Sequence, residues 1–142
     1  MTLSAADELR SQLEHVAGTL LRPRGSVLFV RGDPGTGVYL VRRGLVVLSL
    51  GSGAPKRLAR RLGPGSLIGL PAALSGKTYS LTAEVSEDAE LGFISREAFL
   101  EILRQDPSLC FHVMDILSEQ ISAMRSLMKP PQRRRRHTRK PV

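Results

Sequence analysis

The chain of 142 residues contains one cysteine, no tryptophan, two tyrosines and four phenylalanines. A single cysteine, Cys110, excludes an intramolecular disulfide bond and an iron–sulfur cluster held by several thiolates of one chain. The shortage of aromatic side chains argues against a nucleic-acid platform that works by base stacking. These absences fit a protein of the reducing cytoplasm, and we predict that location.

Long apolar runs and catalytic motifs are absent as well. No segment combines a basic start with a long apolar run, so we expect neither a signal peptide nor a membrane span. The histidines His15, His112 and His137 are far apart and have no Cys, Asp or Glu at metal-ligand spacing. No serine lies in a nucleophile-elbow motif, and no acidic pair has a catalytic spacing. We therefore expect no enzyme, no metal site and no resident cofactor.

The positive charge of the chain is concentrated at its C-terminal end. The formal net charge is +8, but seven of the 21 basic residues lie within residues 129–142, which hold no acidic residue. We predict one folded domain, residues 1–128, and a basic disordered tail, residues 129–142. The tail is either a solvated segment or a polyanion-binding site, which would make the chain a nucleic-acid-binding or scaffold protein. The polyanion contacts would be Arg133, Arg134, Arg135, Arg136, Arg139 and Lys140.

The order of hydrophobic patterns predicts an α+β domain. Apolar residues recur at helical spacing between residues 4 and 21, where Ser4 and Asp7 can form a capping box. Short apolar runs then alternate with turns rich in Gly, Pro, Asp and Ser, which indicates strands at Val27–Val30, Val38–Val41, Leu45–Leu50, Arg57–Leu62, Leu81–Val85 and Leu91–Ile94. Such a series predicts a double-stranded β-helix, or jelly-roll barrel, flanked by the N-terminal helix and two C-terminal helices.

The two C-terminal helices are predicted after Ile94. Ser95 can cap a short one, and Asp106–Pro107 can begin a second, from about residue 108 to 128. Apolar side chains in the second helix recur at alternating steps of four and three residues, as in a coiled coil. Beginning at Cys110, this stripe predicts a homodimer seam formed by Met114, Leu117, Ile121, Met124 and Met128. The alternative is that the same stripe covers the barrel.

Several glycines, a phenylalanine and the proline that opens the last helix occur in the order of a known family. They are Gly25, Gly32–Asp33, Gly44, Gly63–Gly69, Phe99 and Pro107. On these residues the chain resembles the cyclic nucleotide-binding domain of the catabolite-activator and fumarate–nitrate regulator (Crp/Fnr) superfamily, over about residues 5–128. The resemblance implies a regulatory module in signal transduction that dimerises and binds a ligand or a partner protein. Transcription factors of that family continue into a winged helix-turn-helix, for which the 14 residues after Met128 are too few, so we expect a stand-alone sensor domain or a truncated regulator.

The resemblance also locates a ligand site, the phosphate cassette of the family. In that family a glutamate after the glycine binds the ribose, and an arginine about ten residues on pairs with the cyclic phosphate. Here Leu70 occupies the glutamate position, and the arginine position falls on Ser80 counted from Gly69 or on Tyr79 counted back from Ile94–Ser95. Because neither charge is present, we predict that cyclic nucleotides are not bound tightly.

The cassette-equivalent residues are the candidate ligand contacts. They are Gly69, Leu70, Pro71, Ala72, Ala73, Tyr79, Ser80 and Thr82. An apolar wall formed by Leu70, Ala72, Ala73, Leu81 and Ala83 would suit a neutral or planar ligand, or none. Lys77, in the same loop, is either a solvated lysine or a substitute for the arginine, and the second case would make the chain a true cyclic nucleotide receptor with a variant site.

Overall fold

The computed structural model describes residues 5–51, 55 and 59–128. The predicted capping residue Ser4 and the basic tail lie outside the described residues, and so do the side chains of Ile121, Met124 and Met128. The elements in chain order are α1 (Ala5–Glu14), β1 (Gly18–Arg22), β2 (Val27–Phe29), β3 (Gly37–Ser49), β4 (Arg60–Leu62), β5 (Leu67–Ile68), α2 (Leu70–Ser75), β6 (Thr82–Ser95), α3 (Arg96–Gln105) and α4 (Leu109–Met128).

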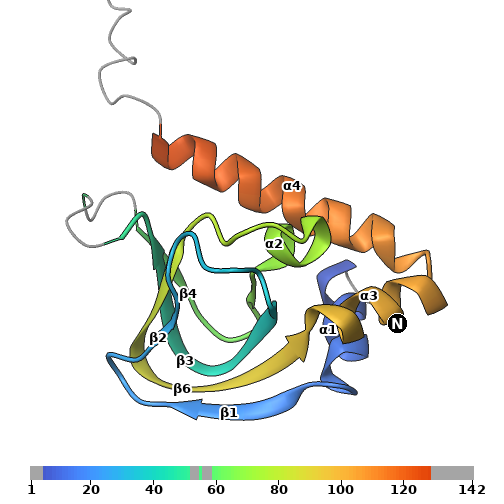
Figure 1. Ribbon diagram of the computed structural model, residues 1–142, viewed down its shortest axis with the longest axis horizontal. Coiled ribbons are helices and arrows are strands. Elements are labelled where there is room, and N and C mark those ends of the chain that lie inside the picture. Colours follow the sequence, from blue (N-terminus) through green and yellow to red (C-terminus); the bar gives the residue numbers. More distant parts are fainter. Residues whose placement is uncertain (1–4, 52–54, 56–58, 129–142) are drawn as a thin grey trace, which may run out of the picture.

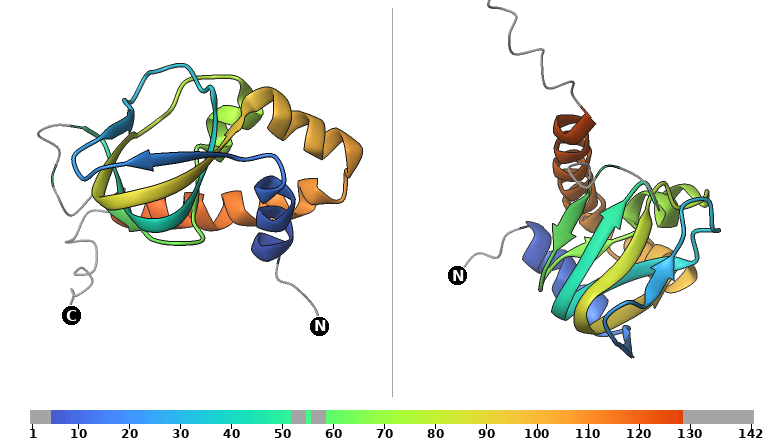
Figure 2. Two further views of the ribbon diagram at one scale, coloured as in Figure 1. Left: turned by 90° about the horizontal axis from the view of Figure 1, so that it is seen from below. Right: turned by 90° about the vertical axis from the view of Figure 1, so that its left-hand side faces the viewer.

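The strands form one curved antiparallel sheet of the jelly-roll type. The order of its strands is β1-β6-β3-β4, while β2 also pairs with β6 and β5 with β3. Helix α4 lies along the side of the sheet that carries α2, and α1 and α3 lie at one end of it (Figures 1 and 2). The predicted α+β jelly roll flanked by helices is therefore confirmed, although the hydrogen bonds between the described strands leave the sheet open rather than closed. Among the described helices, none is both long and apolar enough to cross a membrane.

The two central strands are longer than the sequence pattern indicates. The breaks at Arg43–Gly44 and Glu87–Asp88 lie inside the continuous pair β3 and β6, where the register shifts. Gly44 has a φ of +91°, and a Cβ atom there would lie 2.4 Å from the Asp88 carbonyl oxygen. The glycine therefore forms a β-bulge and does not end a strand.

The N-terminal helix is shorter than predicted. It ends at Glu14, and residues 18–22 form β1, which pairs with β6 at Gly18–Phe93 and Leu20–Leu91. The helical spacing continues through Leu20, but glycine is a poor helix former and the pairing with a distant strand overrides the local pattern. Strand β5 is likewise absent from the prediction, because two residues give no periodicity.

The C-terminal helices begin where the sequence predicts. The backbone N–H of Ala98 donates to Ser95 Oγ at 3.1 Å, so Ser95 is the N-cap of α3. Asp106 follows the last turn of α3, and α4 starts at Leu109, just after Pro107.

Both faces of the central strands are buried, so the described chain has two hydrophobic clusters. Along β3, Val38 and Leu40 face the helices, and Tyr39 and Val41 face the concave side of the sheet, as strand alternation requires. The helix-side cluster comprises Leu9, Leu13, Val38, Leu40, Leu67, Leu70, Ala73, Ile94, Phe99, Leu103, Leu109, Val113 and Ile116. The sheet-side cluster comprises Phe29, Tyr39, Val41, Val46, Ile68, Ala72, Tyr79, Ala83, Val85, Ala89 and Leu91.

A network of charged side chains lies outside both clusters. Arg42 Nη2 donates to Glu14 Oε1 at 2.7 Å, which joins β3 to α1. Arg43 Nη2 donates to Glu90 Oε1 at 3.0 Å, which joins β3 to β6. Hydrogen bonding from Arg43, followed by that from Arg42, holds the pKa of the Glu90 carboxyl below its ordinary value.

Candidate ligand pocket

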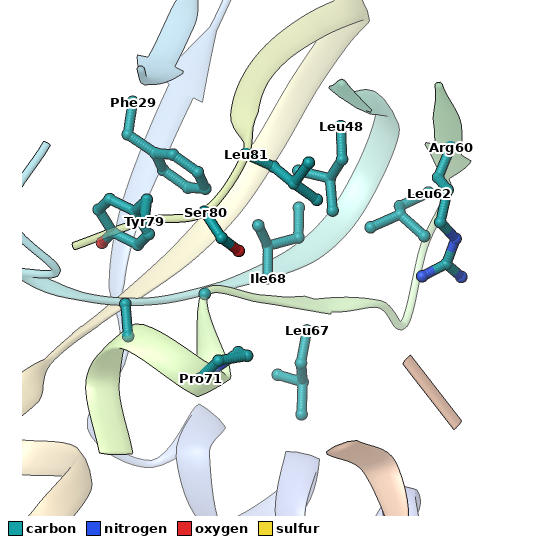
Figure 3. A pocket seen from close by; sticks show the side chains of 12 residues that line it. Phe29, Leu48, Arg60, Leu62, Leu67, Ile68, Pro71, Tyr79, Ser80 and Leu81 are labelled. Carbon is teal, nitrogen blue, oxygen red and sulfur yellow. The ribbon is translucent and has the colours of Figure 1, made fainter. Parts of the chain in front are cut away.

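A small apolar pocket lies between the cassette helix α2 and the concave side of the sheet. Its volume is about 150 Å³. Figure 3 shows Phe29 and Tyr79 at one end of it and Arg60 at the other, with leucine and isoleucine side chains between them. The lining residues are Phe29, Leu48, Arg60, Leu62, Leu67, Ile68, Gly69, Pro71, Ala72, Tyr79, Ser80 and Leu81.

Tyr79 closes the aromatic end of the pocket. Its ring stacks on Phe29 with centroids 3.7 Å apart and planes 10° from parallel. Its hydroxyl donates to the Gly37 carbonyl at 2.8 Å and accepts from the Gly37 N–H at 3.2 Å. The side chain is only 4% exposed, and its hydroxyl is already used by the backbone. At one of the two candidate arginine positions, an aromatic ring therefore fills the space beside the cassette.

Leu70, at the position of the family's glutamate, does not line the pocket. Gly69 precedes α2 with a φ of +94°, and Pro71 lies in the first turn of the helix, as predicted. From there the helix directs Leu70 and Ala73 into the helix-side cluster, while Ala72 contributes to the sheet-side cluster and to the pocket. Leu70 is completely buried. Its side chain is part of the hydrophobic core and packs against the helices.

The remaining candidates divide between the pocket and other contacts. Ser80 is exposed and lines the pocket, whereas Thr82 Oγ1 accepts a hydrogen bond from the Arg31 N–H at 2.9 Å. Lys77 is exposed and does not line the pocket. Of the eight candidate contacts, the five that surround the pocket are Gly69, Pro71, Ala72, Tyr79 and Ser80. Ligand binding by these residues stays a prediction.

The predicted apolar wall is also only partly assembled. Ala72 and Leu81 line the pocket, but Leu70 and Ala73 pack against the helices and Ala83 is buried in the sheet-side cluster. The turn of α2 directs Leu70 and Ala73 toward the helices and Ala72 toward the sheet-side cluster.

Arg60 is a pocket residue that the sequence analysis missed. It lies half-buried on β4, and its side chain faces the pocket beside Leu62, two residues further along the strand. Within the part of the chain that the structure describes, no hydrogen bond or ion pair holds its guanidinium. The signal was present, because alternate residues of a predicted strand share a face, but the sequence does not say which strand lies against the cassette.

Helix α4 buries one stripe and exposes another. Leu109, Val113 and Ile116 pack into the helix-side cluster. In the predicted seam, Cys110 is exposed and Met114 is 62% exposed, so these two residues do not cover the barrel. Leu117 is half-buried against the helix-side cluster. Phe111, beside the seam and not part of the prediction, is 71% exposed.

No metal site accompanies the pocket in the described ranges, where no group of three or more His, Cys, Asp or Glu side chains is placed to hold an ion.

Comparison with known proteins agrees with the fold. Residues 22–106 match the family model of the cyclic nucleotide-binding domain. The chain is 33% identical over 102 residues to the cyclic AMP receptor protein of Thermus thermophilus, covering 71% of this chain and 47% of that protein. It therefore spans about half the length of this curated relative.

Two solved structures have the same fold. The Thermus thermophilus catabolite activator protein superposes with a TM-score of 0.68 at 29% identity, covering 82% of this chain and 55% of that one. A structure from work on a cyclic-GMP-dependent signalling pathway that regulates bacterial phytopathogenesis gives a TM-score of 0.72 at 25% identity, covering 87% and 95%. The sheet, cassette helix and C-terminal helices define the class of cyclic nucleotide-binding-like regulatory modules. The chain belongs to the cyclic nucleotide-binding domain family, and its relatives are of the Crp/Fnr type.

Proposed function

We propose that this domain is a cytoplasmic regulatory sensor module with an altered phosphate cassette that no longer binds cyclic nucleotides tightly. We also propose that it acts as a homodimer through α4. The first proposal rests on the side chains that occupy the glutamate and arginine positions of the cassette. Leu70 is buried among the helices. Of the two candidate arginine positions, Tyr79 fills the pocket end with a ring whose hydroxyl is paired to Gly37, and Ser80 lines the pocket without a charge.

The energetics support loss of tight nucleotide binding. A hydrogen bond between a charged donor and a phosphate contributes about 1.5–3 kcal/mol, so its absence weakens binding about tenfold or more. The second loss, the carboxylate that would hold the ribose, adds to this because leucine offers no polar atom. Lys77 does not compensate from its exposed position, since it does not line the pocket.

Calorimetric titration with cyclic AMP, cyclic GMP and cyclic di-GMP tests this proposal. We expect no saturable heat and no rise in the thermal midpoint up to millimolar nucleotide, because tight binding to the folded state must stabilise it. A dissociation constant in the low micromolar range or below would overturn the proposal and identify a true receptor. In that case the Lys77→Gln variant shows whether the lysine replaces the arginine.

The exposed face of α4 supports the homodimer. Met114 and Phe111 are large apolar side chains one turn apart on this face, and neither is covered by the sheet. Cys110 and Met114 begin the heptad spacing that a second, parallel copy of the helix would continue. Burial of these side chains against a second chain would remove apolar surface from water, at about 25 cal/mol per Å².

Sedimentation of two matched variants tests the homodimer. Met114→Glu places a charge within the proposed seam, whereas Ser122→Glu places the same charge on an exposed position of α4 outside it. We expect the unaltered chain and Ser122→Glu to sediment as dimers and Met114→Glu as a monomer. A monomeric unaltered chain, or equal dimerisation of both variants, would contradict a seam at Met114.

A further inference from the structure

The cation at the end of the pocket, Arg60, has no partner among the described residues, although the walls around it are apolar. Arg60 is half-buried, and none of the described side chains or carbonyl groups accepts a hydrogen bond from its guanidinium. A guanidinium presents five N–H donors in a fixed planar fork that matches a carboxylate with two parallel hydrogen bonds. An anionic group at this position would supply the acceptors that the protein does not.

The charges near Arg60 leave this position open to an anion. A second hollow adjoins the guanidinium and is lined also by Arg10 and Glu119. Arg10 pairs with Asp7 and donates to the Gly65 carbonyl at 3.1 Å. Glu119 is exposed and, in this described region, forms no ion pair with Arg60. Among the residues that the structure describes, no carboxylate therefore pairs with the guanidinium.

The rest of the pocket sets the size and polarity of the ligand. The walls between Arg60 and the aromatic end are formed by Leu48, Leu62, Ile68 and Leu81. The volume is about 150 Å³, and a cavity of about this volume lined by Leu, Ile and Phe accommodates a single benzene ring. Pockets for larger, drug-sized ligands have volumes of about 300 Å³ and more.

We propose that this pocket binds a small monocarboxylate with an apolar body, either a single aromatic ring or a short alkyl chain, and that Arg60 pairs with its carboxylate. The ring or chain lies among the leucines and Ile68, in the direction of Phe29 and Tyr79. This inference rests on the proposed function, because it takes the same pocket to be the ligand site of the sensor. It adds the class of ligand and the residue that recognises the charge.

The ligand class is tested with probes that differ in one property at a time. Phenylacetate and hexanoate carry the charge and the apolar body, 2-phenylacetamide carries the body without the charge, and acetate carries the charge without the body. By calorimetry on the full chain, we expect the two apolar acids to bind and the amide and acetate to bind about tenfold more weakly or worse, since each lacks one of the two contributions.

The recognising residue is tested with a pair of neighbouring arginines. Arg60→Gln removes the pocket cation, and Arg61→Gln removes an exposed cation of the same strand that does not line the pocket. We expect phenylacetate affinity to fall about tenfold or more in the first variant and to be unchanged in the second. Circular dichroism on both variants checks folding, and the comparison of acid with amide on the unaltered chain needs no variant.

The outcomes separate this inference from the proposed function. Equal binding of phenylacetate and 2-phenylacetamide, or unchanged binding by a folded Arg60→Gln variant, overturns the role of Arg60. Failure of both apolar acids to bind at millimolar concentration overturns the ligand class, even if cyclic nucleotides also fail to bind and the proposed function stands. Tight binding of a cyclic nucleotide instead overturns the proposed function, and this inference with it.

Discussion

The two hydrophobic clusters of this domain differ in what they do for the site. The helix-side cluster joins α1, α3 and α4 to the sheet, and Leu67 is its one member that lines the pocket. The sheet-side cluster contains both tyrosines, and four of its members, Phe29, Ile68, Ala72 and Tyr79, line the pocket. The cassette helix α2 lies between the clusters and contributes Leu70 to one and Ala72 to the other. Neighbouring residues of the cassette therefore pack into different clusters, and of these two only Ala72, on the sheet side, lines the pocket.

The largest expected effect comes from placing a charge in the helix-side cluster. Leu70→Glu restores the residue type that the family uses for ribose, but here it buries a carboxylate among the helices. We expect a loss of about 5 kcal/mol at neutral pH, because a buried glutamate must be protonated against its ordinary pKa and the leucine packing is lost. Denaturant unfolding measures this change.

A matched substitution at the same position controls for packing. Leu70→Met keeps the volume and the apolar character, and we expect it to lose less than about 1.5 kcal/mol. If Leu70→Glu is as stable as Leu70→Met, the side chain at this position reaches solvent or the pocket, and the distinction between the clusters fails.

The next effect tests the sheet-side cluster at its aromatic end. Tyr79→Ala removes the ring stacked on Phe29 and the hydroxyl paired to Gly37. We expect a loss of about 3–5 kcal/mol in unfolding free energy, as for other large buried aromatic side chains. Tyr79→Phe keeps the stack and should lose about 1–3 kcal/mol, since the Gly37 N–H and carbonyl are left without the hydroxyl. Equal losses in the two variants would show that the ring contributes nothing.

A smaller effect tests the junction between the clusters. At Gly69 a Cβ atom would lie 2.9 Å from the Gly37 carbonyl oxygen and 3.1 Å from Tyr79 Cε1, and φ is +94°. Gly69→Ala should therefore lose about 1–2 kcal/mol from backbone strain alone. Gly63→Ala is the matched control, because nothing lies within 4 Å of a Cβ at that position and its φ is not positive. A thermal midpoint for Gly69→Ala equal to that of Gly63→Ala would contradict the tight approach of α2 to the sheet.

The smallest effect comes from the charged network outside both clusters. The pKa of Glu90 is lowered in the folded state, first by its hydrogen bond from Arg43, so the unfolded state binds the proton more readily. The stability that Glu90 contributes is present above its unfolded pKa and is lost as pH falls through the lower folded pKa. Glu90→Gln should therefore reduce the acid dependence of unfolding slightly relative to the unaltered chain. Identical acid transitions in Glu90→Gln and the unaltered chain would contradict this role.

The sequence predicted the helix starts that depend on a few neighbouring side chains. The Ser95 cap, the first-turn Pro71 and the start of α4 follow from one or two side chains and their backbone partners. Strand β1 does not, because residues 18–22 become a strand only through pairing with residues 89–93. The continuity of β3 also required the structure, since Gly44 breaks the pattern in sequence but forms a bulge in space.

In the site as well, features set by neighbouring residues were predicted and features set by distant residues were not. The cassette positions were located by their spacing from Gly69 and Ser95, and five of the eight candidate contacts surround the pocket. The inward orientation of the Tyr79 side chain depends on contacts with Phe29 and Gly37, which are distant in sequence. Arg60 was missed because its role depends on the position of β4 opposite α2, which no local pattern specifies.

The burial of Leu70 and the backbone pairing of Tyr79 also have an evolutionary consequence. A carboxylate introduced at position 70 alone would replace a buried leucine and destabilise the fold before any guanidinium is present to add ligand affinity. The same holds for a guanidinium at position 79, where the ring is buried and its hydroxyl is paired. Position 80 is exposed at the pocket and would accept a guanidinium without loss of a core side chain, so selection for a charged cassette would meet its main barrier at Leu70.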